Sequence, residues 1–209
     1  MPFLQTVLFA AVPLMAIVNP VAQVGLFLDI SQNRSQPGRH AAALEVALGV
    51  WLVLTVAAVA GLLLLSFLGI EMAAFRSAGG LLLVVLGLEM LQGREPDAKG
   101  AERTPDDRED ALWVPLVMPL LAGPGAIVTS ITLAARETYS VWFVPLATII
   151  AVTLASLFVF LVLTLAVFVS EHVRGRGARI LTRFSGLILV AIGFQMGFTG
   201  VAEFFGVGR

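Results

Sequence analysis

The stretch LLAGPGAIVTS, residues 120–130, lies in a long apolar run and contains a helix breaker. Pro124 has no backbone N–H, and its ring would clash with the carbonyl of Leu120 in a continuous helix, so this carbonyl loses its donor. Gly123 and Gly125 on either side permit non-helical dihedral angles and close approach by another group. Bare peptide groups in an apolar environment need partners. We therefore predict that residues 123–125 are an unwound point in a membrane helix.

The composition is that of an integral membrane protein. Of the 209 residues, 58% are hydrophobic and 13% are charged, and the mean hydropathy of +0.96 lies far above that of a soluble domain. The chain has no cysteine, which excludes disulfides, thiolate nucleophiles and Cys-ligated metals. Its N-terminal apolar stretch lacks a basic start and a small-residue cleavage site, so we interpret it as a retained span.

Six apolar segments are each long enough for the ~20 residues that a helix needs to cross a membrane. A stretch dense in charges of both signs separates the third segment from the fourth, and we predict it to be a solvated linker. The chain then divides into residues 1–92, the linker 93–111 and residues 112–209. The predicted spans are 4–28, 41–68, 72–91, 112–134, 141–169 and 180–205.

The two halves of the chain resemble each other. GLLLVVLGLEM, beginning at Gly80, aligns with GLILVAIGFQM, beginning at Gly186, so that Gly87 pairs with Gly193. These glycines predict smooth helix faces that pack closely. A nearly equal offset places the break at Pro20 opposite the one described above. Because each half contains three membrane-spanning helices, an odd number, the second half must enter the membrane from the side opposite to the first. We predict an all-α membrane protein with six transmembrane helices in two inverted three-helix repeats, of which the first and fourth helices are broken.

The distribution of basic residues predicts the orientation. Ten lie in or beside the loops after spans one, three and five, and three lie on the side of the termini. Because positive charge gathers on the cytoplasmic side, we expect the linker 93–111 in the cytoplasm and both termini outside. The ten are Arg34, Arg39, Arg94, Lys99, Arg103, Arg108, Arg174, Arg176, Arg179 and Arg183, and the three are Arg76, Arg136 and Arg209.

The two breaks predict a binding site near the bilayer midplane. Half-helix N-termini offer N–H groups to an anion, and freed carbonyls accept from a cation, so a zwitterion fits both. The alternative is that the prolines only kink two spans; their matched positions in opposed repeats favour a site. For Gln23 and Thr129 a second alternative is a helix-to-helix hydrogen bond worth about 1 kcal/mol or less. The predicted binding residues are Asn19, Pro20, Gln23, Gly123, Pro124, Gly125, Ala126 and Thr129.

Carboxylates occur only toward the ends of the spans. Asp29, Glu45 and Glu89 fall within the cytoplasmic third of their predicted helices. They are either solvated helix-end residues or proton-coupling groups. A midplane without fixed charge favours a small neutral or zwitterionic solute. H⁺ or Na⁺ is the candidate coupling ion, and we expect neither cofactor nor resident metal.

The two breaker motifs carry a family resemblance. NPVAQVGLFLDIS from Asn19 and PLLAGPGAIVTSI from Pro119, with six spans in opposed triplets and a charged central linker, resemble the MarC family of bacterial and archaeal membrane proteins. That family includes a transporter of small neutral amino acids. The resemblance implies a place in the cytoplasmic membrane. It also implies that Asn19, Pro20, Gly123, Pro124 and Gly125 are the signature positions here.

We therefore expect a secondary transporter for amino acids such as glycine or alanine, with alternating access around the two breaks. The alternatives are a channel, a non-transporting membrane scaffold or an exporter of another small solute. An enzyme is not expected, because His40 and His172 lie near helix ends and no HExxH or GxSxG pattern occurs. The expected partners are the small-molecule substrate and the lipid bilayer, and no nucleic acid.

Overall fold

Every regular element is helical in the residues that the computed structural model describes, which are 3–92, 112–138, 145–168 and 176–207. The first half of the chain forms α1 (Phe3–Val18), α2 (Pro20–Ser31), α3 (Gln36–Phe67) and α4 (Met72–Gln92). The second half forms the π-helix η1 (Leu112–Leu121), α6 (Pro124–Thr138), α7 (Leu146–Phe168) and α8 (Arg176–Phe204).

The helices occur where the apolar segments predict them, with shifts at some ends. α3 begins at Gln36 and not at residue 41, because Ser35 caps it and Pro37 follows in its first turn. α8 begins at Arg176, so Arg176, Arg179 and Arg183, which were expected in or beside the loop before it, lie on its first turns. Arg174 lies outside the described residues. The predicted linker 93–111 lies outside the described residues.

Among the described residues, four helices are long and apolar enough to cross a membrane: α3, α4, α7 and the part of α8 from Arg183. The pair α1 and α2, which meet at a bend of 46°, forms a fifth candidate span if the two are taken together. η1 and α6 have 10 and 15 residues. Neither reaches the ~20 residues needed to cross alone.

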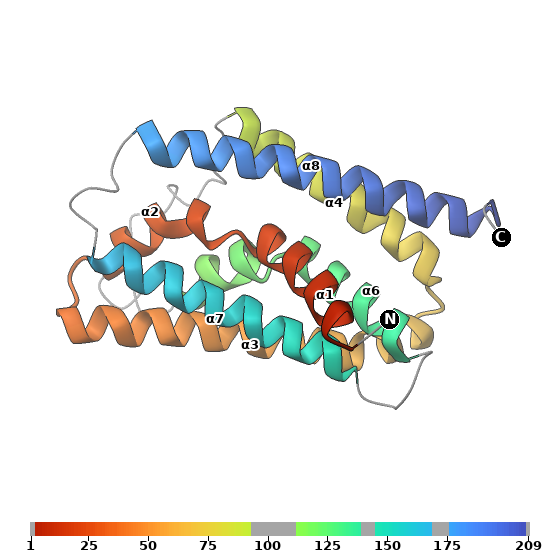
Figure 1. Ribbon diagram of the computed structural model, residues 1–209, viewed down its shortest axis with the longest axis horizontal. Helices are drawn as coiled ribbons and strands as arrows, with labels where there is room; N and C mark the ends of the chain where they lie inside the picture. Colours follow the sequence, from red (N-terminus) through yellow and green to blue (C-terminus); the bar gives the residue numbers. More distant parts are fainter. Residues whose placement is uncertain (1–2, 93–111, 139–144, 169–175, 208–209) are drawn as a thin grey trace.

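The helices form three layers (Figure 1). α4 and α8 lie side by side in one outer layer, α3 and α7 in the other, and the broken helices lie between them. This middle layer holds much of the core, including the fully buried Leu14, Phe27 and Leu116. Asn19 at the first break and Gly123 at the second are buried in this layer.

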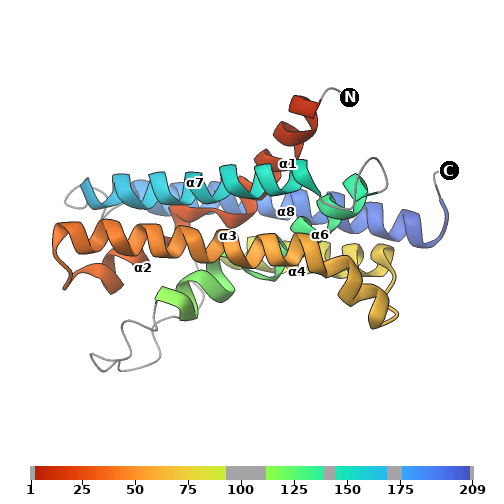
Figure 2. The same cartoon turned by 90° about the horizontal axis from the view of Figure 1, so that it is seen from below.

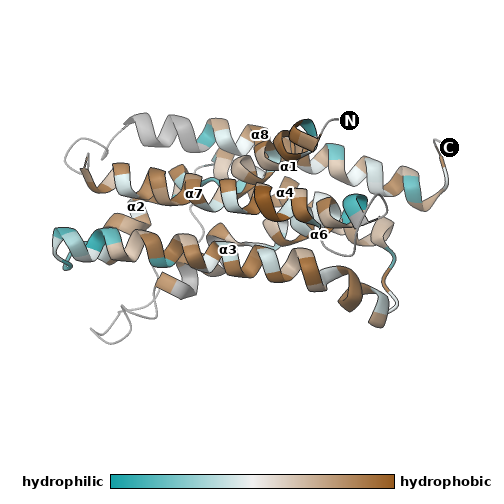
Figure 3. Ribbon diagram, turned by 60° about the horizontal axis from the view of Figure 1, so that its bottom comes forward, coloured by the Kyte–Doolittle hydropathy of each residue, from teal (hydrophilic) through white to brown (hydrophobic). Residues whose placement is uncertain are grey.

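Hydrophobic residues occur along most of the length of the helices (Figure 3), and many of their large side chains are exposed. The N-terminal end of α1 leaves the bundle (Figure 2) and exposes Phe3 and Phe9. α3 exposes Leu52 and Leu63, and α8 exposes Phe198. Such extensive apolar exposure suits a lipid environment and not water.

The helices α4 and α8 run antiparallel and meet through glycines. A Cβ atom added to Gly80 would lie 2.6 Å from the carbonyl oxygen of Gly193, and one added to Gly193 would lie 2.7 Å from that of Gly80. The corresponding distances for Gly87 and Gly186 are 2.7 and 2.8 Å. The predicted packing role of these glycines is confirmed, since any side chain there would push the backbones apart.

Candidate functional site

The first break is centred on Asn19. Its backbone is left-handed, with φ 41° and ψ 63°, and it is the one non-glycine residue with positive φ in the described chain. Asparagine tolerates this conformation better than most residues. Its N–H donates to the Met15 carbonyl at 3.1 Å, and its carbonyl accepts from the Ala22 N–H at 3.2 Å. α1 thus ends and α2 begins within one residue.

Pro20 explains why the helix cannot continue. As the first residue of α2 it needs no intrahelical donor, and its fixed φ suits a helix start. Because it has no N–H, the carbonyl of Ala16, four residues earlier, receives no hydrogen bond from it. The break therefore removes the usual helical donor to a carbonyl at the end of α1, beside the N-terminus of α2.

The second break lies between η1 and α6. The Ala122 N–H donates to the Val117 carbonyl at 2.8 Å, a π-type spacing, and the Gly123 carbonyl accepts from the Ile127 N–H at 3.0 Å. α6 begins at Pro124. The prediction that residues 123–125 are all unwound is therefore wrong at its C-terminal end: Gly125 lies in the first turn of α6, because Pro124 favours a helix start and does not interrupt one.

Gly125 brings the two breaks together. A Cβ atom at this position would overlap the side chain of Leu83 of α4 and would lie 3.7 Å from Cγ2 of Ile17. Ile17 is two residues before Asn19. Gly125 is therefore a close-packing position at which α6 approaches both α4 and the end of α1.

A pocket of about 200 Å³ lies at the first break. Its walls come from both halves of the chain: α1 and α2 on one side, α7 and α8 on the other. The lining residues are Met15, Ala16, Asn19, Val21, Phe158, Ser185 and Ile188.

Asn19 is, with Ser185, one of the two polar residues that line this pocket. The residue is only 9% exposed, and its Nδ2 has no hydrogen-bond partner among the described residues. An unsatisfied buried donor costs about 1–3 kcal/mol. Asn19 Nδ2 is therefore the candidate polar contact at the first break.

The other predicted binding residues do not line the pocket. Pro20 is buried at the start of α2, Gln23 is half-buried and Pro124 is exposed. Ala126 is buried in the core. Thr129 Oγ1 lies 4.0 Å from the Met196 sulfur, a contact between α6 and α8.

The candidate coupling carboxylates are also apart from the pocket. Asp29 is exposed on α2, and Glu45 and Glu89 are half-buried on α3 and α4. None of the three lines the cavity at Asn19.

Sequence reasoning missed most of the pocket wall, including Met15, Phe158, Ser185 and Ile188. Ala16 could have been found, because the proline rule applied to Pro124 also identifies the carbonyl four residues before Pro20. The α7 and α8 residues carry no signal of their own, since an apolar residue facing a pocket looks the same in sequence as one facing lipid.

The family model and the similar proteins all point to one family of membrane proteins. The family model described as MarC family integral membrane protein matches residues 4–205. A UPF0056 membrane protein of Pyrococcus abyssi is 34% identical over 98% of both chains. The UPF0056 membrane protein YhcE of Escherichia coli K12 is 30% identical over 92% of this chain and 90% of its own. The UPF0056 inner membrane protein MarC of Escherichia coli O1:K1 is 30% identical over 92% of both.

No solved structure matches the chain at a significant level. The family assignment therefore rests on the sequence, over nearly its whole length. The chain belongs to the MarC family of integral membrane proteins.

Proposed function

We propose that this protein is a secondary transporter of small neutral, zwitterionic amino acids such as glycine or alanine. The observation that carries the proposal is the buried Nδ2 of Asn19, which has no partner in the described chain and belongs to a residue that lines a small pocket at a helix break.

The break offers complementary groups for both charges of an amino acid. Asn19 Nδ2 and the N-terminus of α2 donate to a carboxylate, which the positive end of the helix dipole also stabilises. The freed carbonyl of Ala16 accepts from an ammonium group. These partners replace the water that a zwitterion loses on entering the membrane, so the site needs no charged side chain.

The size of the pocket supports a small substrate. The pocket has a volume of about 200 Å³. A drug-sized ligand usually needs a pocket of at least about 300 Å³.

Two inverted repeats provide a frame for alternating access, with η1 and α6 together as the fourth span. The glycine contacts support this arrangement. The alignment of the two halves relates Gly80 to Gly186 and Gly87 to Gly193. It therefore converts the observed contact Gly80–Gly193 into the contact Gly186–Gly87, which is also present. An antiparallel pair with this property is what a two-fold axis in the membrane plane would produce.

Transport is tested with purified protein in proteoliposomes. We expect labelled alanine to enter faster when the vesicles are preloaded with unlabelled alanine, because a carrier exchanges substrate. A channel would give flux without this stimulation, and a scaffold would give none.

Asn19→Gly is the informative variant. Glycine accepts the left-handed backbone, so folding is retained while the amide is lost. We expect the affinity for alanine to fall by about 1.5–3 kcal/mol, the value of a hydrogen bond to a charged group. Ser66→Ala, which removes an exposed hydroxyl at the end of α3, is the control. Unchanged affinity in Asn19→Gly would remove the basis of the proposed site.

Proton coupling through Glu45 or Glu89 remains part of the proposal. If either carries the coupled proton, Glu→Gln there should abolish uptake driven by a pH gradient and leave alanine exchange intact. Unaltered coupling in both variants would assign these residues to solvated helix ends.

A further inference from the structure

We infer that Phe158 of α7 and Ile188 of α8 set the largest substrate side chain that the pocket at Asn19 accepts. The inference rests on the proposed function, which it deepens by assigning specificity to residues of the second repeat. It uses the division of the pocket wall between the two halves of the chain.

The groups proposed to bind the amino and carboxyl groups of the substrate lie on the first repeat. Asn19 and the carbonyl of Ala16 belong to the break between α1 and α2, where the common part of every amino acid is held. A substrate held there directs its side chain toward the remaining walls. Those walls are Met15 and Val21 of the first repeat and Phe158, Ser185 and Ile188 of α7 and α8.

Two of these residues are large and apolar. Phe158 is half-buried, and Ile188 is 38% exposed. Both have room to vary without opening the fully buried core. Ser185 is small and leaves the width of the cavity to its neighbours. On the side of the second repeat, the limit on the size of the substrate side chain therefore comes from the aromatic ring of Phe158 and the branched side chain of Ile188.

The packing of Phe158 and Ile188 predicts opposite effects for opposite substitutions. Phe158→Ala and Ile188→Ala enlarge the cavity and should admit valine and leucine. Ile188→Phe narrows it and should favour glycine over alanine. A methylene in an apolar pocket changes discrimination by about tenfold or more, so the effects are measurable.

The experiment is a competition assay in proteoliposomes. It measures how strongly unlabelled glycine, alanine, valine or leucine inhibits the exchange of labelled glycine. For the wild type we expect competition by glycine and alanine and little by leucine. In Phe158→Ala and Ile188→Ala we expect the ratio of leucine to glycine competition to rise at least about tenfold. In Ile188→Phe the ratio of alanine to glycine competition should fall.

Neighbouring residues provide matched controls. Leu157 and Leu187 are 50% and 54% exposed, adjoin Phe158 and Ile188 in sequence and do not line the pocket. Leu157→Ala and Leu187→Ala should keep the wild-type preference. Thermal unfolding in detergent separates loss of fold from change of preference.

The outcomes separate the inference from the function. Wild-type exchange of glycine and alanine, with the same order of preference in every folded variant, would overturn the inference and leave transport intact. A wild type that exchanges neither amino acid would overturn both. A shift in the Leu157 and Leu187 controls equal to that in the pocket variants would also overturn the assignment, because preference would not depend on the cavity wall.

Discussion

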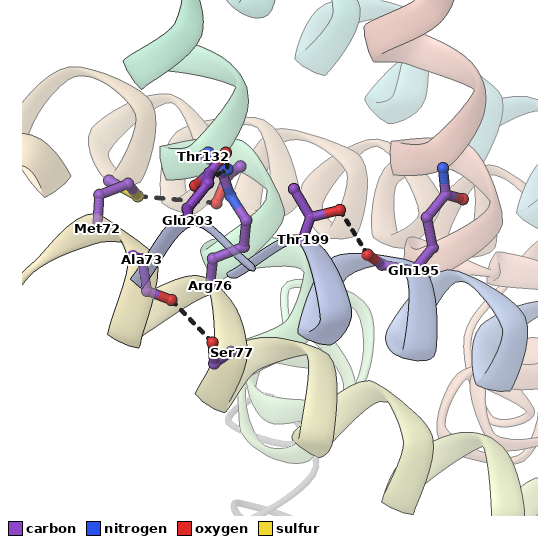
Figure 4. Close-up of polar contacts among 8 residues, drawn as sticks. All are labelled: Met72, Ala73, Arg76, Ser77, Thr132, Gln195, Thr199 and Glu203. Atoms are coloured by element: carbon purple, nitrogen blue, oxygen red, sulfur yellow. Dashed lines mark hydrogen bonds and ion pairs between the residues drawn. The ribbon is translucent and has the colours of Figure 1, made fainter. Parts of the chain in front are cut away.

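Arg76 of α4 and Glu203 of α8 form an ion pair across 127 residues of sequence, with the Nη1 atom facing both carboxylate oxygens (Figure 4). The two partners differ in burial, because the side chain of Arg76 is 5% exposed and that of Glu203 is 47% exposed. Nε of Arg76 has no partner in the described chain. The ion pair links α4 of the first half to α8 of the second half. The two helices also approach closely at Gly200, because a Cβ atom added there would lie 2.7 Å from the Ala73 carbonyl oxygen.

The unequal burial predicts unequal effects of removing the partners. Glu203→Gln leaves a buried guanidinium without a counter-charge, and we expect a loss of about 1–3 kcal/mol in stability. Arg76→Met leaves a half-exposed carboxylate that water can reach, so the loss should be smaller. Thermal unfolding of both variants in detergent measures the difference. If Arg76→Met is the more damaging, the packing of the arginine side chain matters more than its charge.

The glycine contact between α4 and α8 predicts intolerance of a single methyl group. In Gly80→Ala the new Cβ would meet the backbone of Gly193 and Gly197, which cannot rotate away. We expect a loss of about 1–3 kcal/mol from overpacking. Gly25→Ala on α2 is the control, since nothing lies within 4 Å of that Cβ position. Equal stability of the two variants in a denaturant titration would contradict the close approach.

Gly125 and Leu83 should behave as a coupled pair. Gly125→Ala introduces a Cβ that overlaps the Leu83 side chain, and Leu83→Ala removes the obstruction. The double variant should therefore be less unstable than the sum of the single losses, with a coupling of about 0.5–3 kcal/mol. Simple additivity in thermal unfolding would show that α4 and α6 do not touch there.

The orientation in the membrane can be measured directly because the chain has no cysteine. A cysteine replacing Ala98, in the linker 93–111, should resist a membrane-impermeant thiol reagent in intact cells and react after the cells are opened. A cysteine replacing Gly208, near the C-terminus, should react in intact cells. Labelling of Ala98→Cys from outside would reverse the topology.

Much of this architecture follows from local physical chemistry that is visible in the sequence. Long apolar segments place the helices, because a chain in lipid must satisfy its own peptide groups. Pro20 and Pro124 locate both breaks to within a residue or two, since proline cannot donate to the preceding turn. The aligned glycines of α4 and α8 predict a close-packed pair. Asn19 also emerges from the sequence as a candidate binding residue.

The remaining features depend on which helices meet. No local signal distinguishes Phe158 or Ile188 from lipid-facing neighbours, and only the juxtaposition of α7, α8 and the first break makes them a pocket wall. Likewise, the sequence alone presents Gly125 as a backbone breaker, whereas its neighbour Leu83 makes it a packing contact. The tertiary structure also buries the Arg76 side chain beside Glu203 and leaves Asn19 Nδ2 without a hydrogen-bond partner in the described chain. Neither could be predicted from the sequence, because burial and hydrogen bonding depend on neighbours that lie far apart along the chain.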